Sequence, residues 1–176
     1  KAEAEKILEQ VKKEKAEIEK LLQQVQKYQK LKKGDVAVDK GGMCKYRVTG
    51  KDTVRVIGAA KKGKTAKTLT IYSTVRLSGK VYKVTAVGDN AFKGNKYATK
   101  IVMGKNITKI GKHAFDGCKK VKLIKIKSKK LKYVRSYAFK NIYSKAVIKV
   151  SSSKLKAYTK LIKNSKISKN VRIKKI

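Results

Sequence analysis

Lysine side chains carry most of the chemistry that this sequence offers. The 176 residues include 49 Lys or Arg against 11 Asp or Glu, a formal net charge of +38. Only five of the basic residues are Arg, so the charge comes mainly from hydrated ammonium groups, which attract anions diffusely. The composition favours polyanions as partners and argues against base-specific reading of nucleic acid. A coding bias towards Lys is an equally weighted alternative explanation of the charge.

Groups able to perform acid–base or metal chemistry are few and scattered. His113 is the only His, and it has no Cys or carboxylate at ligand spacing. The five Asp match neither a Ca²⁺ loop nor a two-carboxylate hydrolase: Asp35, Asp39, Asp52, Asp89 and Asp116. We therefore expect no enzyme, no catalytic residue, no metal site and no cofactor.

The two cysteines could form a disulfide or remain free thiols. Cys44 and Cys118 enclose 74 residues, and a disulfide between them would stabilise the fold by about 4 kcal/mol through chain entropy. Free Cys is also among the most buried residue types, so packing alone explains both thiols. Packing is the favoured interpretation.

Residues 1–33 are predicted to form one amphipathic helix. Apolar residues recur at the two core positions of a heptad, with Ala4, Val11, Ile18 and Val25 at position a and Ile7, Leu21 and Tyr28 at position d. Glu14 interrupts the d column. The stripe permits a cap on the following domain, the end of a longer upstream helix, or self-association, and the first two are favoured. No apolar run is long enough for a transmembrane segment.

Residues 34–83 change to alternating apolar and polar positions, which predicts a β-rich lead-in segment of short hairpins. After it, residues 84–154 contain three repeats marked by the dipeptide Ala-Phe, with Phe92, Phe115 and Phe139 spaced by 23 and 24 residues. A unit this short cannot bury its own apolar face, so the units must stack as a solenoid. Residues 155–176 abandon the motif and predict a helix and strand that cap the stack, with Ser152 or Ser153 capping the helix.

Each repeat ends in a short strand, KIVM, LIKI or VIKV, which adds one strand to a parallel sheet. Because side chains alternate along a strand, Ile124 and Ile126 point inward and Leu123 points outward. The outward basic positions Lys100, Lys125, Lys127 and Lys149 are the candidate polyanion or partner site.

The motif IGKHAFDGCKKVKLIKI, with the β segment before it, resembles the BspA-type leucine-rich repeat family over about residues 36–176. The resemblance implies a repeat solenoid of parallel strands, and with the long helix and small β segment predicted before the repeats the expected fold class is an α/β repeat solenoid. It also implies an extracellular or surface-anchored bacterial protein that binds host or matrix proteins and has no active site in the repeats.

Together these observations predict a non-enzymatic surface or secreted module that mediates adhesion or macromolecular binding. A host or matrix protein or an anionic polysaccharide is the expected partner, with nucleic acid disfavoured. The alternatives are a nucleic-acid-binding protein and a structural spacer that presents another domain. Oligomerisation through the N-terminal helix is possible but not favoured.

Overall fold

The computed structural model describes residues 2–28 and 30–176, and the chain divides into two compact units, Lys1–Leu31 and Lys32–Ile176. The first unit consists of the helix α1 (Ala2–Tyr28), which confirms the predicted N-terminal helix. Glu3 and Glu5 lie in its first turn, where carboxylates stabilise the positive end of the helix dipole. No helix in the described ranges combines the length and the apolar character needed to cross a membrane.

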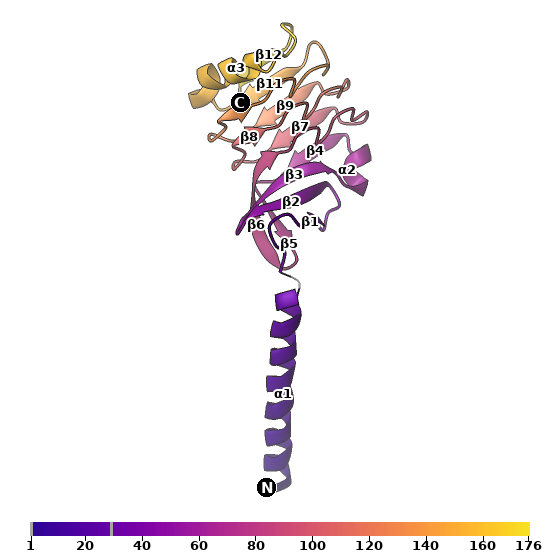
Figure 1. Ribbon diagram of the computed structural model, residues 1–176, viewed down its shortest axis with the longest axis vertical. Coiled ribbons are helices and arrows are strands. Elements are labelled where there is room, and N and C mark those ends of the chain that lie inside the picture. Colours follow the sequence, from indigo (N-terminus) through magenta and orange to yellow (C-terminus); the bar gives the residue numbers. More distant parts are fainter. Residues whose placement is uncertain (1, 29) are drawn as a thin grey trace. The chain divides into compact units, whose positions relative to one another are not determined.

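The second unit contains a parallel sheet, and its strands lie side by side (Figure 1). Its five strands, in spatial order, are β12 (Arg172–Lys175), β11 (Val147–Val150), β9 (Leu123–Ile126), β7 (Lys100–Met103) and β4 (Thr68–Ile71). The predicted strands KIVM, LIKI and VIKV are β7, β9 and β11, and their pairing is parallel, as expected. Inward side chains such as Ile101, Ile124 and Ile148 are fully buried. The parallel-strand, leucine-rich-repeat-like architecture is therefore confirmed.

The lead-in segment forms most of a second, seven-stranded sheet. Its strands are β1 (Val36–Val38), β2 (Cys44–Gly50), β3 (Thr53–Ala59), β5 (Thr74–Leu77), β6 (Lys80–Val87), β8 (Lys109–Ile110) and β10 (Tyr133–Val134). They follow the order β1-β2-β3-β6-β8-β10, with β5 paired to β6. The strands β2 and β3 form an antiparallel hairpin, whereas β3 and β6 run parallel. A short helix, α2 (Lys61–Thr65), follows β3.

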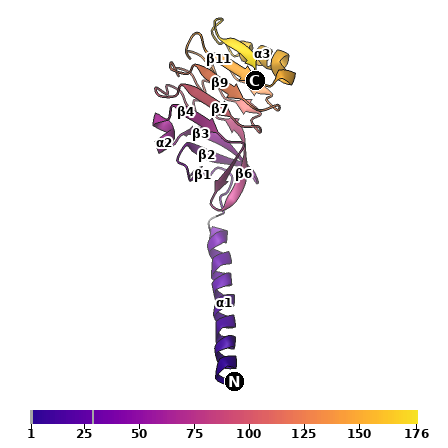
Figure 2. The ribbon, with the colours of Figure 1, turned by 180° about the vertical axis from the view of Figure 1, so that it is seen from behind.

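One strand lies where the sequence analysis did not expect it. The alternating pattern predicts that Thr68–Ile71 belongs to the hairpins of the lead-in segment. That prediction is wrong, because β4 pairs in parallel with β7 and Leu69 lies opposite Ile101. Alternating polarity is the same in parallel and antiparallel strands, so the pattern cannot distinguish the two. The connection that returns the chain to the sheet decides the pairing. Figure 2 shows β4, β7, β9 and β11 side by side from behind.

The turns that carry Ala-Phe stack directly on one another. The ring centroids of Phe92 and Phe115 lie 5.3 Å apart, with 4° between the ring planes. The centroids of Phe115 and Phe139 lie 5.7 Å apart, with 2° between the planes. Backbone groups join the same turns, since the Phe92 N–H donates to the Ala114 carbonyl and the Phe115 N–H to the Ala138 carbonyl, both at 2.8 Å. Each turn thus supplies both the apolar surface and the acceptors that the preceding turn requires.

The stack ends at the 3₁₀ turn η1 (Ser152–Lys154), the helix α3 (Leu155–Asn164) and β12. Tyr158 is buried, and its hydroxyl accepts a hydrogen bond of 2.9 Å from the Leu131 N–H. The expected serine cap is wrong: because η1 precedes α3, Lys154 occupies the N-cap position and makes no side-chain capping bond.

Truncation of the middle ring tests the stack. We expect Phe115→Ala to lower the free energy of unfolding by about 3–5 kcal/mol, because Phe115 is fully buried between two other rings and its space cannot collapse easily. Thermal or urea denaturation of the purified chain measures the change. Tyr133→Ala, at a position 54% exposed, is the control and should change stability little. Equal losses in the two variants would contradict the role of the ring stack.

Candidate functional site

The outer face of the five-stranded sheet is the strongest candidate site, because the pairing register lines its basic side chains up. Residues with the same parity along β7, β9, β11 and β12 point to the same side, and the inward set is the buried one. The register then places outward residues of successive strands directly beside one another.

One outward row contains three lysines in succession, and we call it the lysine row. Lys125 of β9 lies opposite Lys149 of β11, and Lys149 lies opposite Lys174 of β12. Neighbouring strands are about 4.8 Å apart, so adjacent charges at that separation repel by roughly 0.9 kcal/mol even at the dielectric constant of water. Val102 and Thr70 continue the row on β7 and β4 without charge. The row is therefore a line of like charges that the backbone holds together.

The adjacent outward row is mixed. Lys100 of β7 lies beside Leu123, which lies beside Val147 and then Arg172. Leu123 and Val147 are only half-buried, so they present apolar surface alongside the lysine row. Lys127 follows β9, is exposed, and points outward in the next row. Of the four predicted site residues, the structure pairs Lys125 with Lys149, whereas Lys100 and Lys127 lie in the flanking rows.

The sequence analysis missed the basic residues of β12, Arg172 and Lys174, because the closing strand lacks the repeat motif. The alternating segment VRIKKI was a signal that could have placed them. Positive charge in the last third of the chain is also unopposed, because residues 117–176 contain 21 Lys or Arg and no Asp or Glu. The lysine row thus has no acidic neighbour in the chain that follows Asp116.

A second basic surface is a recess of about 460 Å³ near the start of the stack, where no Ala-Phe turn precedes Phe92. Four lysines line it, Lys45, Lys64, Lys93 and Lys96, together with the half-exposed ring of Tyr97. Ala91 and Phe92 contribute apolar surface. No sequence motif indicates this recess, because β2, α2 and the turn after β6 meet only in the folded chain.

His113 has a partner that the sequence analysis did not foresee. Its Nδ1 lies 2.7 Å from Asp116 Oδ2, three residues along the same turn, and the side chain of Asn141 donates to the other Asp116 oxygen at 3.2 Å. The carboxylate therefore joins the second and third turns. No group of three or more metal-ligating side chains occurs among the described residues.

The residue before Ala-Phe holds a left-handed backbone in each turn. His113 and Tyr137 have φ of 53° and 60°, and their rings stack at 5.0 Å. Tyr137 accepts a hydrogen bond from Lys166 at 3.3 Å, and this bond, with the charge of Lys166 and nearby lysines, lowers the pKa of the phenol. The backbone conformation, rather than the side chain, is what the turn requires, so the residue type varies.

Both cysteines are buried and free. The Cys118 thiol donates to the Phe92 carbonyl at 3.1 Å, so it fills the space beneath the turn and satisfies an acceptor there. Burial raises the pKa of each thiol, Cys44 and Cys118, to about 12. At neutral pH both groups are therefore protonated and unreactive.

Thiol labelling tests this assignment. In the native chain at pH 8 we expect almost no reaction with a chromogenic disulfide reagent, and two thiols per chain once the chain is denatured. The raised pKa values keep the nucleophilic thiolate scarce until pH approaches 12, and burial blocks access. Prompt reaction of the folded chain, or no free thiol after denaturation without reductant, would contradict the assignment of two buried, free thiols.

The comparisons with known proteins agree with this architecture. The family model for the BspA type leucine-rich repeat region matches six copies over residues 72–176. The solved structure of a leucine-rich repeat protein from Bacteroides capillosus matches with a TM-score of 0.56 and 18% identity, covering 75% of this chain and 94% of that one. A leucine-rich cell surface protein from Faecalibacterium prausnitzii matches with a TM-score of 0.47 and 15% identity, covering 80% of this chain and 32% of that one. No curated protein matches the chain.

Proposed function

The chain belongs to the BspA-type leucine-rich repeat family, and from that membership we propose that it is a non-enzymatic cell-surface or secreted module that binds anionic macromolecules. The lysine row carries the proposal. Three in-register lysines repel one another, and a polyanion that lies along the row removes that repulsion. An anionic polysaccharide or an acidic host or matrix protein fits this requirement.

We infer further that the repeat turns and the parallel strands form a solenoid. Each of the three Ala-Phe repeats contributes one Phe ring to the stack and one strand, β7, β9 or β11, to the five-stranded sheet, which β4 and β12 extend at its two edges. A second short parallel ladder, β6-β8-β10, follows the same order. A solenoid explains why the lysines align, because corresponding residues of successive units lie one strand apart.

The surrounding residues favour contact with a polymer over contact with a single small anion. The row runs across three neighbouring strands, it lies beside half-buried Leu123 and Val147, and Lys100 and Arg172 continue positive charge at its flank. Nearly all the positive charge belongs to Lys, whose ammonium is a hydrated point charge without the planar fork that Arg offers for bidentate recognition, so nucleic acid is the less favoured polyanion.

Heparin chromatography tests the lysine row. We expect the triple variant Lys125→Glu, Lys149→Glu, Lys174→Glu to elute at clearly lower salt than the parent chain. Its binding constant should also depend less steeply on salt, by roughly two to three in the logarithmic slope, because fewer counterions are released. Lys174 is exposed, and the half-buried Lys125 and Lys149 point away from the buried face of the sheet, so stability should change little.

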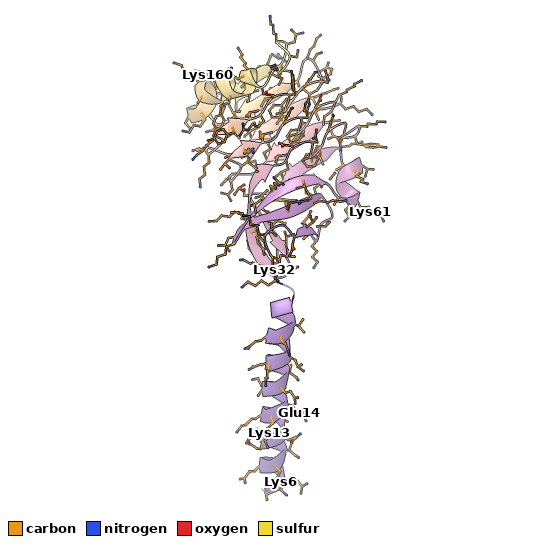
Figure 3. The ribbon with its side chains drawn as sticks, viewed as in Figure 1. Lys6, Lys13, Glu14, Lys32, Lys61 and Lys160 are labelled. Carbon is orange, nitrogen blue, oxygen red and sulfur yellow. The ribbon has the colours of Figure 1, made fainter. Side chains whose placement is uncertain are left out.

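The matched control replaces three exposed lysines outside the sheet, Lys61, Lys120 and Lys156, with Glu. Figure 3 shows Lys61 on α2, away from the strands of the parallel sheet. Both variants change the net charge by the same amount, so a difference between them reports position. Equal elution of the two triple variants would reject the lysine row as the site, and elution of the parent below physiological salt would reject polyanion binding.

A further inference from the structure

The helix α1 is a unit of its own and carries an exposed apolar stripe. The stripe consists of side chains that are 50–64% exposed: Ile7, Leu8, Val11, Ile18, Leu21, Leu22 and Val25. One helix cannot bury its own stripe, and most helical stability in proteins comes from packing of such a face. The stripe therefore requires a partner, and the polar residues within it indicate which partner.

Two charged residues lie in the middle of the stripe. Glu14 occupies heptad position d, and Lys15 occupies the adjacent position e. Figure 3 shows Glu14 about midway along α1. Neighbouring residues on one helix do not face each other, so Glu14 and Lys15 of the same chain do not form a pair. The Gln10 side-chain amide donates a hydrogen bond of 3.1 Å to Glu14, but an apolar partner surface would still bury the carboxylate charge without a counter-ion, at high cost in free energy.

A second copy of the same helix compensates both charges. In a parallel, in-register coiled coil, a residue at d packs into a hole that includes position e of the facing helix. Glu14 of each chain then shares a layer with the partner's Glu14 and lies beside the partner's Lys15, so that two lysines flank the two carboxylates. The antiparallel arrangement instead packs Glu14 against an apolar residue at position a and places Lys15 beside a residue at position e of the partner, so Glu14 has no lysine beside it. Charge complementarity thus favours one partner and one orientation.

The apolar residues select the number of helices. Three of the four residues at position a are β-branched, Val11, Ile18 and Val25, and position d is mixed, with Leu21 its one Leu. β-branched residues at a with Leu at d favour two strands in parallel coiled coils.

We propose that α1 pairs with α1 of a second copy as a parallel two-stranded coiled coil, in which Glu14 of each chain forms an ion pair with the partner's Lys15. The dimer contains two copies of the unit Lys32–Ile176, so both copies can bind one extended ligand and increase avidity. This inference does not depend on the ligand, because its tests measure self-association alone.

Charge reversal in the full chain tests the ion pair. We expect the parent to be a dimer by sedimentation equilibrium at tens of micromolar, and Glu14→Lys or Lys15→Glu to raise the dimer Kd at least about tenfold, because each reversal juxtaposes like charges. The double variant Glu14→Lys, Lys15→Glu should recover the parental Kd. An equimolar mixture of the two single variants should form heterodimers, since every contact in the layer is then attractive.

The matched controls are Glu9→Lys and Lys12→Glu, which make the same charge changes at the outward positions f and b of the same helix. Lys12 Nζ and Glu9 Oε2 lie 3.9 Å apart, and both side chains are more than 60% exposed. Reversal of either charge should therefore leave the Kd nearly unchanged. Lys and Glu are both good helix formers, so helix propensity is constant across the series.

Orientation is tested by Ala4→Cys with an oxidant, because position 4 meets the partner's position 4 only in the parallel arrangement. The native thiols are buried, so the introduced one is the accessible thiol. Rapid formation of a cross-linked dimer supports the proposal. A monomeric parent, a trimer or larger oligomer, a double variant that stays weak, or no cross-link in the oxidised variant would each overturn it.

Discussion

Stacking of one Ala-Phe turn on the next is the interaction on which the rest of this structure depends. A single turn buries too little apolar area to compensate its conformational entropy. Parallel Phe rings 5.3–5.7 Å apart and N–H groups that donate to the next turn supply the missing burial and hydrogen bonds together. Both requirements are met only by a neighbour in the correct register, so stability and register have the same cause.

The same register produces the chemistry of the outer face. Stacking turns in register also stacks the strands that precede and follow them, and this sets Lys125, Lys149 and Lys174 one strand apart. The repulsion among them is small compared with the apolar burial that holds the strands. The fold therefore keeps these charges close together at modest cost, and that proximity is what a polyanion can exploit.

Different elements border the two ends of the stack of turns. At the C-terminal end, α3 and β12 cover the last turn, with the Tyr158 hydroxyl satisfying the Leu131 N–H. At the other end, β4 extends the parallel sheet while β3 lies beside β6, and the turn that contains Phe92 borders a lysine-lined recess. The terminal elements are thus both structural caps and the places where new surface features arise.

The sequence by itself determined the periodic elements. The heptad stripe predicted α1, the Ala-Phe dipeptides predicted the stacked turns, and alternating apolar residues identified the strands β7, β9 and β11, because each depends on local periodicity. Tertiary structure alone decided the rest. It placed β4 in the parallel sheet, brought Asn141 to Asp116, and aligned Lys174 of a strand without the motif beside Lys149. These contacts depend on how the chain returns to a sheet or a turn, which residue spacing along a single segment does not encode.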